Sequence, residues 1–544
     1  MPTSTTPRTR TAPPSPSRRE FIRTAGYGTA AAVIASSLIS KARAAPAAAG
    51  SYPTSTDKTE DPLFMSATKI AALIREKKIT AVEAVKRCYK RIDEVNPKIN
   101  AVVMFCRERA LAEAQMCDEA LKQGKILGPL HGVPFTIKDS FDTAGVLSTG
   151  GTLGRKTYVP GKDATVVARV RAAGGILLGK TNTPEFTLGG GSRGTYNLVY
   201  GQTYNPYKDH YNPSGSSGGA GAIVASGGSY FDIGSDYGGS IRGPAHANGI
   251  AGIKPTLGRS PRTGHIVGYG GAFDSFQETG PLARRVEDLY LILSVIGGLD
   301  AWDARMAPVP LGDPAKVDLK SLRVCYALTP TGTPPPTDDN PFTRAPTPQV
   351  AELLKQTVAY FSELGCKIVE DQPPKVRELG QVRQKFEGAD GRDHIRRLLA
   401  KHGTTQASPG LSLTGTVLPS GEFTALCEQM DAIRSEQLAW VENYDLFICP
   451  SGNTPALEVP LEYTRTPTGA GGGGGGNFTS NFNTTGWPGG VVRVGTSDLG
   501  LPIGMQVVGQ PWRDDVVLAA LSHIESKTGG WQKPALEGSP VAKS

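Results

Sequence analysis

A serine in a glycine-rich run is the first candidate for chemistry. Residues 215–219 read Gly-Ser-Ser-Gly-Gly and satisfy G-x-S-x-G, the turn that carries the nucleophile of α/β-hydrolases between a strand and a helix. Ser217 would attack, and the candidate bases are the later histidines His265, His394, His402 and His523. Because residues 205–213 contain two prolines and little that favours a strand, this interpretation lacks the structural context that it needs.

A second glycine pattern would indicate a dinucleotide site. Residues 189–194 satisfy G-x-G-x-x-G, which requires a strand before it and a helix after it. The nearest apolar run ends at Leu178, and the residues that follow Gly194 favour a loop. Dinucleotide binding is therefore not expected.

Three longer motifs are more specific in combination than any one of them alone. They are Gly-Val-Pro-Phe-Thr-Ile-Lys-Asp at 132–139, Gly-Ser-Ser-Gly-Gly at 215–219 and Gly-Ser-Asp-Tyr-Gly-Gly-Ser-Ile-Arg at 234–242. Shorter supporting matches lie at 179–182, 252–256, 280–284 and 500–506. Over roughly residues 66–528 the sequence resembles the amidase signature family of serine hydrolases.

The resemblance implies a Ser–cis-Ser–Lys triad, with Ser240 as nucleophile, Ser216 as bridging serine and Lys138 as base. In that family the peptide bond before Ser216 is cis. The chemistry is coherent, because a serine hydroxyl is a weak nucleophile until a base takes its proton, and a lysine is a base only when burial lowers its pKa. Taken singly, each residue has an ordinary structural role, and only the ordered set favours catalysis. No cofactor and no metal is implied.

The glycines before the nucleophile predict an oxyanion hole. They allow backbone N–H groups to converge on one point, so the amides of Tyr237, Gly238, Gly239 and Ser240 are the expected donors to a tetrahedral intermediate. Supporting roles are expected for Ser217, Asp236 and Arg242, the last two as opposite charges that brace the loop.

Two positions depart from the usual family pattern. Ser214 stands where a glycine is common, and Tyr237 stands where a threonine or a small aliphatic residue is more usual. The ring of Tyr237 could line the acyl pocket. The aromatic residues Phe186, Phe273 and Trp487 also suggest an apolar or aryl acyl pocket, and the alternative for them is ordinary core packing. Among the histidines, which are expected to be non-catalytic, a catalytic role is left open for His131.

The resemblance predicts an amidase, a hydrolase of carbon–nitrogen bonds other than peptide bonds in linear amides. It would form an acyl-enzyme on Ser240 and give a carboxylic acid and ammonia or an amine. The alternatives are an exported esterase or carbamate (urethane) hydrolase with the same triad, and an exported binding protein that has kept the fold without catalysis. A small-molecule amide is the expected partner, and a homodimer is left open.

The elements that must position these residues alternate between helices and strands. Residues 133–138 alternate apolar and polar side chains and predict a short strand that ends at Lys138. Thr80 caps a predicted helix that ends near Pro97. Further predicted elements are a helix at 107–123, a strand at 176–178, a helix from Thr347 followed by a strand at 367–369, and a strand at 446–449. This order indicates an α/β fold, and the resemblance implies a mixed sheet covered by helices on both faces (α/β/α).

The first 44 residues have the order of an export signal. Arg18 and Arg19 precede Phe21, a soft apolar stretch follows, and small residues end the segment near Ala44. This pattern predicts the twin-arginine translocase as an export partner and a periplasmic or secreted product without a stable membrane anchor. Residues 45–62 are predicted as a linker and 63–544 as the amidase domain, with a signature core at about 130–290 and a more variable region at about 300–440.

Composition supports a globular enzyme. The chain has 544 residues, 39% of them hydrophobic, and 67 are glycines, so it can bury a large core. Most of the formal net charge of +8 comes from residues 1–44, so no nucleic-acid partner is expected. The seven cysteines are scattered and form no C-x-x-C pair, which favours buried thiols. The glycine run at 471–476 predicts a loop, with a lid as the alternative.

Overall fold

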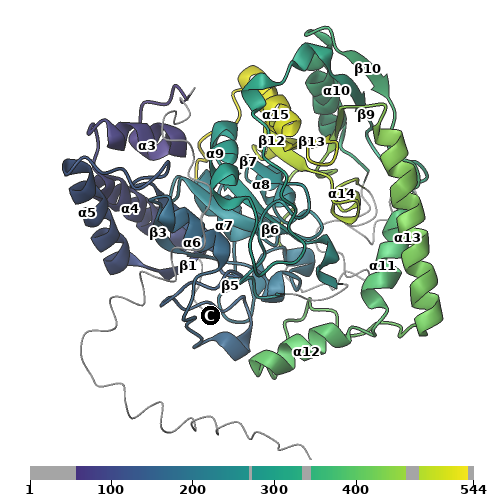
Figure 1. Ribbon diagram of the computed structural model, residues 1–544, viewed down its shortest axis with the longest axis horizontal. Helices are drawn as coiled ribbons and strands as arrows, with labels where there is room; N and C mark the ends of the chain where they lie inside the picture. Colours follow the sequence, from purple (N-terminus) through teal and green to yellow (C-terminus); the bar gives the residue numbers. More distant parts are fainter. Residues whose placement is uncertain (1–54, 56, 269–272, 334–344, 461–476, 537–544) are drawn as a thin grey trace, which may run out of the picture. The chain divides into compact units, whose positions relative to one another are not determined.

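A mixed sheet of eleven strands forms the centre of the fold (Figure 1). A computed structural model describes residue 55 and residues 57–268, 273–333, 345–460 and 477–536. The predicted signal at 1–44 and the glycine run at 471–476 lie outside these residues. The strand order is β1-β3-β2-β6-β8-β7-β12-β13-β11-β9-β10, and the sheet combines parallel pairs with antiparallel ones.

The strands are short, and most are fully buried in their central residues. Their bounds are β1 Val102–Phe105, β2 Pro134–Lys138, β3 Ile176–Thr181, β6 Phe231–Asp236, β7 Ala251–Lys254, β8 Glu278–Ala283, β9 Arg323–Tyr326, β10 Lys367–Glu370, β11 Leu446–Pro450, β12 Gly489–Thr496 and β13 Pro502–Gly509. A separate hairpin pairs β4 Tyr196–Asn197 with β5 Gly201–Gln202. The strands predicted to end at Lys138 and to lie at 176–178, 367–369 and 446–449 are therefore confirmed.

Helices cover both faces of the sheet. Gly252 of β7 pairs with Val491 of β12, so both point to one face, while the preceding residue Gly490 points to the other. A Cβ at Gly252 would lie 3.1 Å from Ala245 of α8 (Arg242–Ala247), whereas a Cβ at Gly490 would lie 2.4 Å from Leu521 of α15 (Asp514–Thr528). The α/β/α arrangement implied by the resemblance is therefore confirmed.

The helices in the described ranges are α3 Ala67–Arg75, α4 Ala81–Ile99, α5 Arg107–Lys122, α6 Thr165–Ala172, α7 Gly218–Ala225, α8 Arg242–Ala247, α9 Val286–Ile296, α10 Pro348–Ser362, α11 Val376–Gly388, α12 Asp393–His402, α13 Ser420–Val441, α14 Asn481–Thr484 and α15 Asp514–Thr528. None of them is long and apolar enough to cross a membrane. The predicted cap of α4 is confirmed, because the Thr80 hydroxyl accepts the amide of Glu83 at 3.0 Å. The helix ends slightly later than predicted, at Ile99, because Pro97 lies in the last turn, and Asn100 closes the helix at φ 46°.

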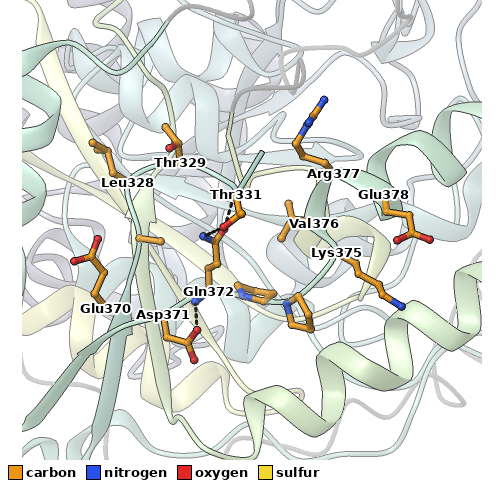
Figure 2. A pocket seen from close by; sticks show the side chains of 13 residues that line it. Leu328, Thr329, Thr331, Glu370, Asp371, Gln372, Lys375, Val376, Arg377 and Glu378 are labelled. Atoms are coloured by element: carbon orange, nitrogen blue, oxygen red, sulfur yellow. Dashed lines mark hydrogen bonds between the residues drawn. The ribbon is translucent and has the colours of Figure 1, made fainter. Parts of the chain in front are cut away.

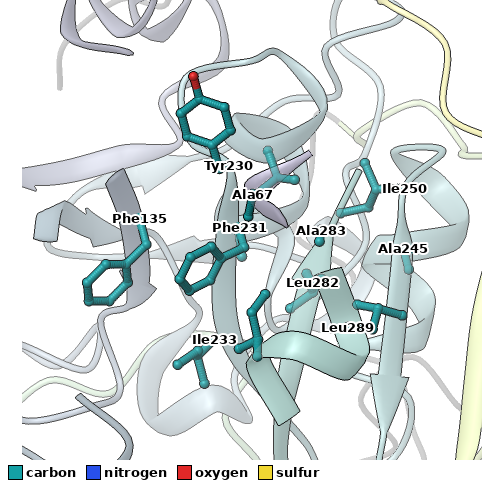
Figure 3. Close-up of a cluster of buried hydrophobic side chains, with 14 of the residues drawn as sticks. Ala67, Phe135, Tyr230, Phe231, Ile233, Ala245, Ile250, Leu282, Ala283 and Leu289 are labelled. Atoms are coloured by element: carbon teal, nitrogen blue, oxygen red, sulfur yellow. The ribbon is translucent and has the colours of Figure 1, made fainter. Parts of the chain in front are cut away.

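The core around the central strands is built from large apolar side chains (Figure 3). Phe135 of β2 stacks on Phe231 of β6, with ring centroids 5.3 Å apart and planes 7° apart. Ile233 extends this layer along β6, whereas Leu282 of β8 pairs with Asp232 and packs on the opposite face of the sheet. Burying one such side chain stabilises the fold by roughly 1.5–3 kcal/mol. The packing fixes β2 and β6, the two strands whose ends carry the predicted active-site residues.

The region at 300–440 lies toward the end of the sheet that β9 and β10 form. Its helix α11 packs against α13 and α14, and the two long helices α11 and α13 lie side by side in Figure 1. Six of the seven cysteines are buried and Cys427 is half-buried; none is in a disulfide, as the scattered spacing predicts.

Candidate active site

Lys138 lies at the carboxyl end of β2 and is fully buried. Its Nζ donates hydrogen bonds to three hydroxyl oxygens, those of Ser216 at 2.7 Å, Ser217 at 2.9 Å and Ser235 at 3.0 Å. The structure therefore brings the predicted base and the predicted bridging serine into direct contact, although 78 residues separate them in the chain.

Burial sets the protonation of this lysine. The loss of hydration lowers the pKa of Lys138 to about 7, and the carboxylates of Asp236 and Asp232 oppose that change. A lysine with a pKa near 7 is neutral in a large fraction of molecules at neutral pH. It can then accept a proton from a hydroxyl, which an ordinary surface lysine cannot do.

The serines at 216 and 217 lie where a tight loop meets α7. The Gly215–Ser216 peptide bond is cis. A Cβ at Gly215 would lie 2.5 Å from the carbonyl oxygen of Gly194, so only glycine fits there. Ser214 has φ 64°, a conformation that favours glycine, which explains why a glycine is usual at this position.

Ser240 lies between β6 and α8 and is 6% exposed. Its carbonyl oxygen accepts the amide of Ser217 at 3.2 Å, so the loop that carries the predicted nucleophile is tied to the loop that carries the bridging serine. Lys138 and Ser216 are thus in direct contact, and the main chain of Ser240 is joined to the neighbouring residue Ser217.

Asp236 fixes the conformation of the loop that carries Ser240. Its carboxylate accepts the amides of Gly239 at 2.7 Å and Ile241 at 3.0 Å, and it is paired with the Arg242 guanidinium at 3.0 Å. Burial alone would raise the pKa of Asp236, but Arg242 and the amide donors outweigh it and hold the pKa of this carboxyl well below its usual range. Arg242 also donates to Gln506 at 2.7 Å.

One predicted oxyanion donor is wrong. The Gly239 amide points into the Asp236 carboxylate, so it is not available to a substrate oxygen. Gly239 has φ 120°, a conformation that favours glycine, and in this conformation of the loop its N–H meets Asp236. The amides of Gly238 and Ser240, by contrast, have no hydrogen-bond partner within the described part of the chain.

Tyr237 faces the variable region. Its hydroxyl donates to Glu387 at 2.8 Å, and its ring lies 6.0 Å from that of Phe276. The other aromatic candidates are core residues: Phe186 packs in one apolar cluster and Trp487 in another. The Phe273 side chain lies outside the described part of the structure.

The histidines of the alternative interpretation do not reach Ser217, whose hydroxyl contacts Lys138 and the Ser235 carbonyl. No strand precedes Ser217 in residues 205–213, as the sequence indicated. His265 instead lies 3.1 Å from the Ser235 hydroxyl, and its burial lowers its pKa well below the usual range. His131 accepts the amide of Leu127 at 3.1 Å.

The sequence interpretation missed two residues that contact this site, Ser235 and Arg383. Ser235 stands inside a quoted motif, so its position beside the nucleophile loop was a usable signal. Arg383 lies on α11 and reaches the carbonyl oxygen of Tyr237 at 2.7 Å, and nothing in its local sequence indicates that contact.

A surface cavity lies away from these residues and contains none of them. It has a volume of about 650 Å³ and is lined by residues 327–329, 331 and 370–378 (Figure 2). Charged side chains such as Glu370, Lys375 and Arg377 surround it, and Thr331 is bonded to Gln372 at its edge. None of the predicted catalytic residues lines this cavity.

Comparison with known proteins gives a consistent result. The chain matches the family model described as Amidase over residues 83–518. It is 33% identical over 472 residues to indoleacetamide hydrolase from Bradyrhizobium diazoefficiens, a match that covers 85% of this chain and 86% of that protein. It is 30% identical over 511 residues to fatty-acid amide hydrolase 2 from Homo sapiens, covering 88% and 91%. The solved structure of 6-aminohexanoate cyclic dimer hydrolase with its substrate matches with a TM-score of 0.73 at 27% identity, covering 87% of this chain and 99% of that one.

Proposed function

Because this chain belongs to the amidase family and hydrolyses amide C–N bonds, we propose that Ser240 is its nucleophile and that Ser216 and Lys138 move the proton. The observation that supports this most strongly is the 2.7 Å contact between a fully buried Lys138 Nζ and the Ser216 hydroxyl. A neutral lysine amine has two N–H groups and one lone pair, so in that form the Ser216 hydroxyl can donate to Nζ across the same distance and Lys138 can act as its base.

Acylation of Ser240 is the first of the two proposed steps. Ser240 Oγ forms a bond to the carbonyl carbon of the amide, and its proton passes through the Ser216 hydroxyl to Lys138 Nζ. The C–N bond then breaks, the proton returns through Ser216 to the departing nitrogen, and ammonia or an amine leaves. An acyl ester on Ser240 remains.

Deacylation repeats the relay with water. A water oxygen attacks the ester carbonyl while its proton passes through Ser216 to Lys138, and the same proton then returns to Ser240 Oγ. The products are a carboxylic acid and the free enzyme. Water and the amide are the only reactants that these steps need.

We assign oxyanion donors to the amides of Gly238 and Ser240, and the Tyr237 amide stays a predicted donor. Of the two assigned donors, one is the amide of the nucleophile itself and the other lies two residues before it, while the Gly239 amide between them is held by Asp236. Donors fixed before the reaction stabilise the developing charge without reorganisation, and each contributes about 2.7–4 kcal/mol in studied hydrolases.

The preference of the enzyme for the leaving group and the acyl group can be measured with matched substrates. We would compare an aryl carboxamide, a peptide amide, and an ester and a carbamate with the same acyl group, using wild type and Ser240→Ala. We expect amide turnover with release of the acid, lost in Ser240→Ala. Turnover of the ester or carbamate without any amide turnover would favour the esterase or urethanase alternative, and no turnover by folded wild type would favour a binding protein.

Export by the twin-arginine route is proposed from Arg18 and Arg19 and the segment that follows them. The double variant Arg18→Lys and Arg19→Lys is expected to stay in the cytoplasm unprocessed, while the wild type is recovered outside it with a new N-terminus near Ala45. Equal export of both would contradict this proposal.

A further inference from the structure

Arg383 belongs to the variable region, yet its guanidinium is built into the nucleophile loop. Nη2 donates to the carbonyl oxygen of Tyr237 at 2.7 Å, Nε donates to Glu387 at 2.7 Å, and Nη1 donates to the Ser480 carbonyl at 3.0 Å. The side chain is 7% exposed, and its guanidinium carbon lies 4.6 Å from the ring centres of both Tyr237 and Phe276. These hydrogen bonds and ring contacts fix the guanidinium, which in turn fixes the position of the Tyr237 carbonyl.

That carbonyl determines where a neighbouring amide points. The carbonyl of Tyr237 and the N–H of Gly238 belong to one peptide unit. This unit is trans, since Gly215–Ser216 is the one cis peptide bond found in the described residues. In a trans peptide the C=O and the N–H point in opposite directions. Arg383 therefore directs the Gly238 N–H away from α11, across the loop.

The second proposed donor is fixed in a different way. The Ser240 amide shares its peptide unit with the Gly239 carbonyl, which accepts the main-chain amide of Gly243 at 2.7 Å. That unit is held by the start of α8. The Tyr237–Gly238 unit is followed by two glycines that add no side-chain restraint, so a side chain from elsewhere has to hold it.

We propose that Arg383 is a positioning residue for the oxyanion hole, which acts by fixing the orientation of the Gly238 amide. The inference rests on the proposed function, since it requires an acyl oxygen beside Ser240. The donor contributes most in the transition state, where the oxygen carries charge, so loss of Arg383 lowers kcat and leaves KM nearly unchanged.

Arg434 offers a matched control. It lies on α13, its guanidinium carbon is 5.8 Å from the Phe276 ring centre, and its Nε donates to the Thr484 carbonyl at 2.8 Å. Arg434 thus lies near the same Phe276 ring as Arg383, but it bonds a main-chain carbonyl outside the nucleophile loop. The comparison of Arg383→Met with Arg434→Met isolates the contact with Tyr237.

The test measures kcat and KM for an amide that the wild type hydrolyses, at a temperature where circular dichroism shows each variant to be folded. Arg383→Met is expected to lose about 10–100-fold in kcat with KM changed by less than about threefold, a smaller loss than that of deleting a donor outright. Arg434→Met is expected to keep the wild-type kcat. Arg383→Ala should regain kcat with added guanidinium chloride and not with sodium chloride.

Equal kcat values for Arg383→Met and Arg434→Met, or a rise in KM at unchanged kcat, would overturn the inference. Arg383→Lys provides a second variant if the methionine variant does not fold: it keeps the charge beside Glu387 and loses the planar fork, so kcat should again fall. Failure of the proposed function is distinguishable, because wild type would then show no adduct on Ser240 with a fluorophosphonate.

Discussion

Asp236 and Tyr237 are neighbours in the chain, but they are held by different parts of the molecule. Asp236 is fully buried and is fixed by amides of its own loop and by Arg242, which in turn bonds Gln506 of β13. Tyr237 is half-buried and is fixed by Arg383 and other residues of α11. The sheet therefore holds the reacting groups, and helix α11 of the variable region holds the part of the loop that carries Tyr237. Changes in the first region should abolish chemistry or folding, and changes in the second should adjust rate.

The largest effect is expected from the base. Lys138→Met keeps the length of the side chain and removes the proton acceptor, so kcat should fall by at least about 10⁴-fold, as for loss of a triad member in other serine hydrolases. Lys375→Met, on the N-terminal side of α11, is the control and should keep the wild-type kcat. A Lys138→Met enzyme within tenfold of wild type would place the base elsewhere.

The next largest effect concerns stability. Asp236→Asn leaves the Arg242 guanidinium buried at 0% exposure without its charge partner. Breaking a buried pair in this way costs about 3–5 kcal/mol, so the free energy of unfolding in a denaturant titration should fall by that amount. A loss below about 1 kcal/mol would show that Gln506 and the other partners of Arg242 suffice to hold the guanidinium.

The pH dependence tests whether neutral Lys138 is the active form. With a pKa of about 7, this lysine is protonated at lower pH and cannot accept a proton, so kcat/KM should fall about tenfold for each pH unit below 7 and level off above it. Burial also raises the pKa of Asp232 to about 7, which makes it the competing origin of this limb.

The variant Asp232→Asn distinguishes Lys138 from Asp232 as the group whose titration causes the fall in kcat/KM at low pH. The Asp232 carboxylate raises the pKa of Lys138, so its removal should move the limb to lower pH while the limb itself persists. A limb that disappears in Asp232→Asn would assign the titration to the carboxyl and contradict the lysine mechanism.

The smallest effect is expected at the surface of the variable region. Lys375 and Glu436 form an ion pair of 2.6 Å between α11 and α13, and both side chains are nearly half exposed. Exposed pairs contribute about 0–1 kcal/mol, so Glu436→Gln should lower the melting temperature by no more than a few degrees and leave kcat unchanged. A large fall in kcat would show that the α11–α13 contact controls the nucleophile loop more tightly than Arg383 alone.

The sequence was sufficient where local order determines structure. The alternation that ends at Lys138, the cap at Thr80 and the glycine-rich motifs give the strand, the helix and the loops that the structure shows. The contact between Lys138 and Ser216 was implied because the motifs occur in the order of a known family.

The sequence was insufficient where direction or long-range contact decides. The glycines before Ser240 indicated that amides can converge, but whether the Gly239 amide meets a substrate or Asp236 depends on the conformation of the folded loop. Arg383 lies 146 residues from Tyr237 on a helix with ordinary amphipathic spacing, so their contact exists only through the packing of α11 against the loop. Ser235 stood within a motif, but its bond to Lys138 required the register of β2 against β6.

The most direct test of the central claim is the intact mass of the protein after reaction with a fluorophosphonate, followed by peptide mapping of the adduct. We predict one adduct, located on Ser240, absent in Ser240→Ala, retained in Ser217→Ala and formed more slowly in Lys138→Met. An adduct on Ser217, or no adduct on folded wild-type protein, would contradict the account.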